Sequence, residues 1–238
     1  MRFILALTLG LFYRAASAQA PTSTSLFWQQ QVAYARVQAA YARCWPTLVA
    51  RLQAQHLDPA RLEVFFRLIK TNRQLEVWAR NQGEATFQVL GRYPLAATSG
   101  TLGPKRYAGD GQVPEGFYHI NRFNPLSAFH LSLGLDYPSA ADVLATGLAD
   151  PGGDIFIHGS NVTDGCLPLT NALVEEVYLL AVAARAAGQA SIAVHIFPFP
   201  LTEAELARRA ASPHAPFWRE LASGYAYFEQ HHVPGAEQ

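Results

Sequence analysis

The chain has 238 residues, half of them hydrophobic, and its 18 basic and 18 acidic residues leave no formal net charge. A chain of this length can bury one substantial hydrophobic core. Proteins that bind nucleic acids usually carry a basic excess, so the balanced charge argues against a nucleic-acid partner.

The first eighteen residues have the layout of a cleavable secretory signal. Arg2 precedes an apolar run from Phe3 to Tyr13, and small residues lead to a cleavage site after Ala18. The run is short for a membrane span, and no other segment is apolar for long enough to cross a bilayer. We therefore expect export with residues 1–18 removed. Arg14 interrupts the usual pattern, which leaves an uncleaved anchor as the alternative.

The segment after the signal, residues 19–60, is predicted to be a helical lead-in. Residues 25–43 carry apolar side chains at helical spacing and contain neither glycine nor proline. Proline suits the first position of a helix, so we expect one helix to end at Pro46 and a second, short helix to begin there.

Strand signals dominate the next part of the chain. Residues 61–70 and 74–80 are rich in Val, Ile, Phe and Trp and flank a polar "TNR", which predicts a hairpin. Residues 85–95 supply another strand. The Gly- and Pro-rich residues 96–114 form a connection long enough to predict a functional loop.

Further strands are expected at 116–120, at 128–135 and in the short apolar run "DIFIH", with a turn at 121–127. Asn171 is predicted to cap a helix through Ala187, and residues 190–200 return to strand.

The chain therefore reads as α+β. It has a β-rich domain of mixed sheets or a sandwich at residues 61–200 and a C-terminal helical extension at 201–238, where Thr202 to Glu205 form a capping box and the aromatic tail packs on the domain.

The stretch "DIFIHGSNVTDGC", residues 154–166, places His158 eight residues before Cys166. Each residue alone is commonly structural, and Cys44 could pair with Cys166 in an oxidising compartment. A zinc site would need His119 or His130 from elsewhere, because no tightly spaced ligand pair is present. We predict neither a metal nor a cofactor.

Nucleophilic catalysis explains more of this stretch. A thiol attacks as the thiolate and needs a nearby base, which the turn at Gly159 could bring to the sulfur. Gly165 would leave room for an acyl group, and the backbone N–H groups at Gly165 and Cys166 could hold a developing oxyanion. The Thr163 hydroxyl would brace the loop.

"HGSNVTDGC" resembles the His-Gly and Ser/Thr-x-Gly-Cys signature of the L,D-transpeptidases with a YkuD-type catalytic domain. Segments such as "VFFRLIK", "FHLSLGLDYP" and "GQASIAVHIFPF" resemble its YafK-like branch, from about residue 61 to 200. The resemblance implies that Cys166 is the nucleophile, that His158 is its base and that the Gly159 carbonyl orients the imidazole. Thr163 and Gly165 take the signature Ser/Thr and glycine positions.

The implied chemistry is acyl transfer on diaminopimelate-containing stem peptides of peptidoglycan through a Cys166 thioester. An amine acceptor would complete a cross-link or attach a protein to the wall, whereas water would make the enzyme a hydrolase. Hydrolytic release of wall-linked protein is associated with the YafK-like branch. The implied location is the periplasm or cell envelope of a bacterium.

The sequence departs from the family directly after the nucleophile. Many members carry an arginine there, whereas this chain has Leu167 and Pro168. We expect cations elsewhere to bind the diaminopimelate carboxylate. The candidates are Lys105, Arg106 and Arg122, and His130 is a further candidate for the site lining. The rival hypothesis is a non-catalytic wall-binding module stapled by a Cys44–Cys166 disulfide.

Overall fold

The computed structural model describes residues 25–148 and 151–235, so the predicted signal lies outside the described residues. The strands are β1 (Leu62–Ile69), β2 (Gln74–Asn81), β3 (Gln88–Pro94), β4 (Gly116–Asn124), β5 (Ser132–Leu135), β6 (Phe156–His158), β7 (Leu167–Pro168) and β8 (Ala193–Phe197). The helices are α1 (Leu26–Val32), α2 (Ala35–Ala54), α3 (Ala140–Thr146), α4 (Asn171–Ala186), α5 (Glu203–Arg208) and α6 (Ala215–His231), with 3-10 turns η1 (Pro59–Arg61) and η2 (Lys70–Asn72).

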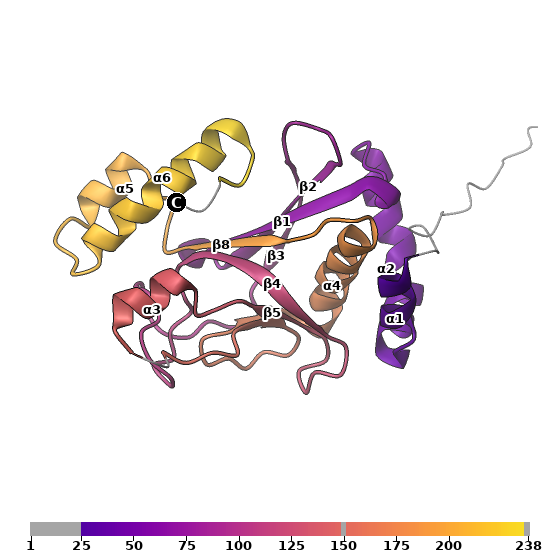
Figure 1. Ribbon diagram of the computed structural model, residues 1–238, viewed down its shortest axis with the longest axis horizontal. Helices are drawn as coiled ribbons and strands as arrows, with labels where there is room; N and C mark the ends of the chain where they lie inside the picture. Colours follow the sequence, from indigo (N-terminus) through magenta and orange to yellow (C-terminus); the bar gives the residue numbers. More distant parts are fainter. Residues whose placement is uncertain (1–24, 149–150, 236–238) are drawn as a thin grey trace, which may run out of the picture.

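The strands form one curled mixed sheet in the order β3-β2-β1-β8-β4-β5-β6-β7 (Figure 1). β1 and β2 pair antiparallel as the predicted hairpin, while β8 inserts between β1 and β4 and runs parallel to β1. The predicted α+β class, with a β-rich domain and helices at both ends, is confirmed.

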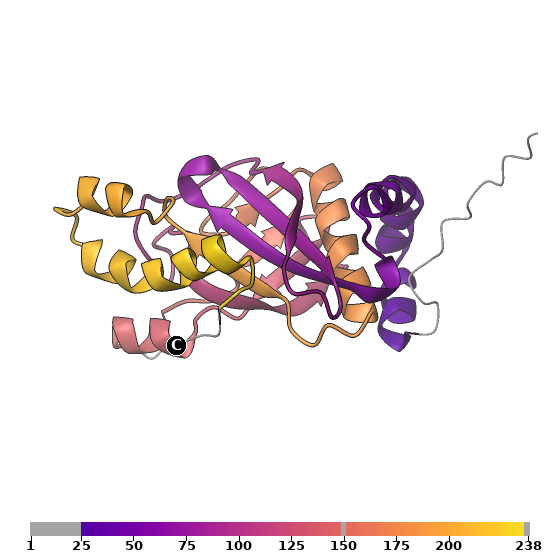
Figure 2. The same ribbon diagram turned by 90° about the horizontal axis from the view of Figure 1, so that it is seen from above.

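Successive side chains of β1 point to opposite faces of the sheet, and both faces are covered by helices. Val64, Phe66 and Leu68 join the main core with α4, whereas Phe65 and Ile69 join smaller clusters with residues of α6. Figure 1 shows α4 between the sheet and α2, and Figure 2 shows α6 running along the opposite side. Because β1 is buried on both faces, its sequence is apolar almost throughout.

The N-terminal helices differ from the prediction at Pro46. α2 continues through Pro46, and the chain breaks instead at Ala33 and Tyr34, where no glycine or proline signals it. Proline removes one helical hydrogen bond, but Trp45 and Leu48 are buried beside it and their packing maintains the helix. Tertiary contacts therefore override the local signal.

The predicted turn at 121–127 and the predicted cap of α4 also need correction. β4 extends to Asn124, pairing with Ser132 of β5. The N-cap of α4 is Thr170, whose hydroxyl accepts the Leu173 N–H, and the Asn171 side chain instead accepts the Ser160 N–H at 2.9 Å. Helix α3 begins with a capping box at Ser139 and Asp142 and is an element that the sequence pattern did not indicate.

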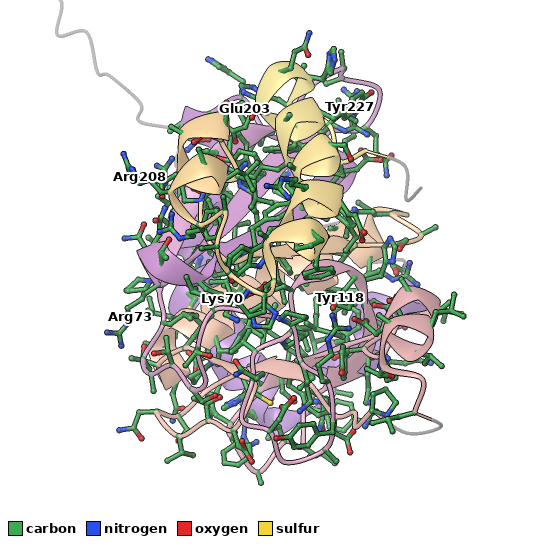
Figure 3. All side chains as sticks on the ribbon, turned by 90° about the vertical axis from the view of Figure 1, so that its left-hand side faces the viewer. Lys70, Arg73, Tyr118, Glu203, Arg208 and Tyr227 are labelled. Carbon is green, nitrogen blue, oxygen red and sulfur yellow. The ribbon has the colours of Figure 1, made fainter. Side chains whose placement is uncertain are left out.

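The C-terminal helices dock through a buried polar cluster near η2. Glu115 accepts hydrogen bonds from Lys70 Nζ at 2.8 Å, the Gly103 N–H at 2.8 Å and Trp218 Nε1 at 2.9 Å. Figure 3 shows Lys70 and Tyr118 below the helix pair, where α6 meets the domain. The connection at residues 96–114, which we call the long loop, is therefore joined to the sheet and to α6 at the Glu115 carboxylate. No helix in the described ranges is long and apolar enough to span a bilayer.

Candidate active site

β6 and β7 bring the two predicted reactive residues together. The strands pair in parallel, with Ile157 opposite Leu167 and His158 opposite Pro168. Cys166 directly precedes β7, and its sulfur lies against β6, where it accepts the Phe156 N–H at 3.4 Å. Phe156 and His158 are two residues apart on one strand, so they face the same side of the sheet. The thiol therefore lies beside the strand that carries the imidazole.

The His158 imidazole is fixed by its own neighbour. Nδ1 lies 2.5 Å from the Gly159 carbonyl oxygen, and because a carbonyl can only accept, Nδ1 carries the proton and Nε2 is left as the basic nitrogen. The Phe129 ring packs on the imidazole with centroids 4.9 Å apart. His158 is 2% exposed. Burial lowers the pKa of His158, and the bond to Gly159 only partly opposes this effect. The lowered pKa keeps the ring neutral at neutral pH.

The Cys166 thiol is partly exposed and protonated at rest. Burial raises the pKa of Cys166, the Phe156 N–H lowers it, the nearby Asp164 and Asp154 carboxylates raise it and Lys105 lowers it, with a net increase. The sulfur also lies 3.6 Å from the Asp154 carbonyl oxygen. The resting pair is therefore a thiol and a neutral imidazole rather than a preformed ion pair.

In the loop between His158 and Cys166, Thr163 has the predicted bracing bond, but Gly165 does not have its predicted role. Thr163 Oγ1 donates to the Cys166 carbonyl at 2.8 Å. The Gly165 N–H is already given to Ser99 Oγ at 2.8 Å, so it cannot serve as an oxyanion donor. With φ at +89°, a Cβ on Gly165 would lie 2.7 Å from the Gln112 carbonyl oxygen. The long loop, rather than an acyl group, occupies that space.

The three candidate cations lie in different surroundings. Lys105 is buried, and its Nζ bonds Asp110 Oδ1 at 2.7 Å and the Tyr107 carbonyl at 3.0 Å. The Arg106 guanidinium lies over the Phe217 ring, 5.6 Å from its centroid. Neither side chain points an unengaged charge at the thiol.

The Arg122 side chain packs on a residue of β6. Its guanidinium packs 5.2 Å from the centroid of the Phe156 ring, on the residue whose N–H bonds the Cys166 sulfur. It makes a long contact of 3.5 Å with Asp154, and its side chain is 55% exposed. Arg122 is therefore an exposed cation that packs on a residue bonded to the Cys166 sulfur.

His130 lies behind Gly159 and bonds a carboxylate. Its Nε2 is 2.6 Å from Glu175 Oε1 on α4. A Cβ added to Gly159 would come within 2.9 Å of the His130 Cβ. The structure thus places His130 against the backbone of the site rather than beside the sulfur. No local pattern indicated that Glu175 pairs with His130 or that Phe129 covers His158, because each pair is far apart in the chain.

The disulfide expected in the rival hypothesis is absent, because Cys44 and Cys166 are both free thiols. The Cys44 sulfur lies 3.5 Å from Glu175, whereas Cys166 lies against β6. Across the described residues, no group of three or more His, Cys, Asp or Glu side chains is arranged to hold a metal ion.

Comparisons with known proteins identify the family of the chain. The YkuD family model, described as the L,D-transpeptidase catalytic domain, matches residues 64–186. The Escherichia coli K12 protein named "Putative L,D-transpeptidase YafK" is 36% identical over 173 residues, which are 72% of this chain and 68% of that protein.

Among solved structures, the helical cell shape determining protein Pgp2 of Campylobacter jejuni covers 71% of this chain and 70% of its own, at 19% identity and a TM-score of 0.46. Bd1075 of Bdellovibrio bacteriovorus covers 70% and 57%, at 18% identity and a TM-score of 0.41. Because the family model matches residues 64–186 and the relative is 36% identical, this chain belongs to the family of L,D-transpeptidase catalytic domains of the YkuD type.

Proposed function

We propose that the chain is an exported cysteine enzyme that transfers acyl groups of peptidoglycan stem peptides through a thioester on Cys166. The observation that carries the proposal is the hydrogen bond from His158 Nδ1 to the Gly159 carbonyl, which leaves Nε2 as a base on the strand against which the sulfur lies. This arrangement supports nucleophilic catalysis without an acidic third residue.

The first half-reaction breaks an amide bond. The Cys166 thiol gives its proton to His158 Nε2 as the sulfur attacks the amide carbonyl, and the resulting imidazolium stays bonded to Gly159. The tetrahedral intermediate collapses when that proton passes to the departing amine. A thioester on Cys166 and a neutral His158 remain. The second half-reaction repeats these steps with an incoming nucleophile and returns the thiol.

The oxyanion of the intermediate needs donors that are not already engaged. The Gly165 N–H bonds Ser99, which leaves the Cys166 N–H as the donor at the turn that we assign to the oxyanion. The bond from Thr163 to the Cys166 carbonyl supports this role because it holds the peptide group that follows the nucleophile. Closure of the long loop against Gly165 keeps that turn in place.

We assign the diaminopimelate carboxylate to Arg122 rather than to Lys105 or Arg106. Lys105 is buried against Asp110 and is better suited to fixing its loop and adding positive field at the thiol. The Arg122 guanidinium is accessible, and its ion pair with Asp154 is long. A planar guanidinium packed on Phe156, whose N–H bonds the Cys166 sulfur, could take the place of the arginine that many family members carry after the nucleophile.

The same thioester supports transfer and hydrolysis, which differ only in the second nucleophile. An amine acceptor gives a cross-link or a wall-linked protein, and water gives a hydrolase. Of these, we place transfer first because the matching family is described by transpeptidation. Hydrolysis is the second candidate, favoured by the partial exposure of Cys166, which gives water a route to the thioester.

Incubation of the protein with purified sacculi, followed by mass analysis of the released and joined muropeptides, tests the proposal. A Cys166 thioester should be trapped on the intact protein in acid, and both it and turnover should disappear in Cys166→Ala. Cys44→Ala is the matched control and should retain both. Turnover by Cys166→Ala would rule out the mechanism, and the ratio of joined to hydrolysed products separates transfer from hydrolysis.

A further inference from the structure

A buried carboxylate on α4 collects partners from separate segments behind the catalytic pair. The Glu175 side chain is 3% exposed and accepts bonds from Arg43 at 2.5 and 3.0 Å and from His130 Nε2 at 2.6 Å. The Cys44 sulfur lies 3.5 Å away. A carboxylate buried without such partners would be strongly destabilising. Glu175 therefore ties α2, α4 and the chain at His130 to one another.

These partners keep Glu175 ionised. Burial would raise the pKa of Glu175, but hydrogen bonds from Arg43, His130 and Cys44 outweigh it and hold the pKa below its ordinary value. The effect on Cys44 is the opposite, because burial and the Glu175 carboxylate raise its pKa to about 11. Cys44 is thus an inert donor in this cluster and not a second nucleophile.

The cluster holds residues 127–131, which we call the His130 loop. His130 has φ of +73°, a left-handed conformation that costs about 1 kcal/mol or more for a residue with a side chain. Its ring is held by Glu175, and Arg36 of α2 donates to the carbonyl oxygens of Ser127, at 2.8 Å, and of His130. The loop is therefore clamped at its side chain and at its backbone.

The His130 loop in turn holds the catalytic base. The Gly159 N–H donates to the carbonyl oxygens of Phe129, at 2.9 Å, and Leu131, at 3.2 Å. The other side of the same residue, the Gly159 carbonyl, accepts from His158 Nδ1. The Phe129 ring also covers the imidazole. A displaced loop would release Gly159 and expose His158 in the same step.

We propose that Glu175 is a positioning residue for His158, acting through the His130 loop together with Arg36 and Arg43 of α2. The inference rests on the proposed function in that it takes His158 as the base. The family match begins at residue 64, so both arginines lie outside it. The catalytic domain of this chain therefore depends on a helix that precedes it.

Glu175→Gln tests the proposal, and Glu176→Gln is the matched control. Glu176 is the next residue of α4 and also pairs with an arginine of α2, since Arg51 bonds it at 2.7 Å, but its other partner is Tyr93 of β3. In Glu175→Gln we expect kcat to fall about tenfold with KM little changed, because the base is misplaced in every complex. Exchange of the Gly159 amide hydrogen should accelerate about tenfold or more as its two acceptors loosen.

The pKa of His158, followed by NMR in a Cys166→Ala background, separates positioning from a direct charge effect. Charged and titratable groups in the surrounding segments are Glu175 and His130 behind Gly159 and Asp154 and Asp164 near the thiol. Removing the Glu175 charge by itself would lower the pKa of His158. Uncovering the imidazole removes the burial that lowers this pKa, so the proposal predicts an increase in Glu175→Gln.

The proposal is overturned if folded Glu175→Gln keeps wild-type kcat and Gly159 exchange, or if Glu176→Gln changes both equally. Should Glu175→Gln not fold, His130→Asn serves, because asparagine tolerates left-handed backbone but is too short to reach Glu175. Unchanged Gly159 exchange in that variant overturns the proposal. Exchange and NMR need no substrate, so an inactive wild type would contradict the proposed function while leaving this inference testable.

Discussion

The hydroxyl of Thr163 donates to the carbonyl oxygen of Cys166 at 2.8 Å, so the loop is closed on the peptide that follows the thiol. The bond spans three residues and fixes the turn from which the sulfur and the Cys166 N–H project. Its removal tests whether this turn must be held for catalysis.

Thr163→Val keeps the shape of the side chain but removes the donor. We expect kcat to fall about tenfold because the nucleophile and the oxyanion donor lose their fixed geometry. Thr163→Ser, which keeps the hydroxyl, is the control and should retain most of the activity. Steady-state kinetics on a defined muropeptide measures both. Equal activity of the Val and Ser variants would contradict the role.

The raised pKa of Cys166 predicts slow alkylation at neutral pH. Alkylation requires the thiolate, so the rate with iodoacetamide should continue to rise through and above the ordinary thiol range. The Asp154 and Asp164 carboxylates contribute to the shift, so Asp154→Asn and Asp164→Asn should each speed alkylation at pH 8. Peptide mass analysis separates Cys166 from Cys44, whose pKa of about 11 makes it the slower site. A plateau near neutral pH would show a preformed thiolate instead.

Arg122→Gln should raise KM for a stem peptide with a free diaminopimelate carboxylate by about tenfold or more, the value expected for a lost charge-assisted bond. Amidation of that carboxylate should raise the wild-type KM by a similar factor and leave the variant unaffected. Arg208→Gln removes the same charge from exposed α5 and is the control. If Arg122→Gln still discriminates between the two peptides, another residue binds the carboxylate.

Gly165→Ala should lose activity because the loop cannot accept the methyl group. The added Cβ would lie 2.7 Å from backbone oxygen of Gln112 at a positive φ, a strain of about 1–3 kcal/mol that displaces one loop or the other. Gly153→Ala, whose Cβ meets nothing within 4 Å, should keep its activity. Turnover and thermal unfolding are measured together. Full activity of Gly165→Ala would show that the contact between the loops is dispensable.

Glu115→Ala should destabilise the protein by about 3–5 kcal/mol, since it leaves the buried Lys70 ammonium unpaired. Burial lowers the pKa of Lys70 and Glu115 opposes this, so loss of Glu115 lowers that pKa further. The double variant Lys70→Met with Glu115→Leu should recover much of the loss by removing both charges. Urea unfolding measures the free energies. A single variant as stable as the wild type would show that the cluster does not fasten α6.

The closeness of His158 and Cys166 was predictable because both lie within nine residues and a single strand and turn relate them. The strands were predictable from local patterns of Val, Ile, Phe and Trp. Their order was not, since β8 reaches its place beside β1 only through tertiary packing.

Tertiary packing also explains why the predictions for Pro46 and Gly165 were wrong. Pro46 stays helical because its neighbours are buried, and Gly165 is explained by Gln112, which is more than fifty residues away. The roles of Phe129 and Glu175 depend on contacts between segments that no spacing in the sequence reveals.

The position of β8 has a consequence for the order in which the enzyme is made. β8 joins the hairpin of β1 and β2 to the half of the sheet that carries His158 and Cys166, yet it is synthesised after both. A nascent chain therefore contains its nucleophile before the strand that unites the sheet, and such non-local pairing is slow to form. We therefore expect activity to appear when the sheet assembles rather than when the thiol is synthesised.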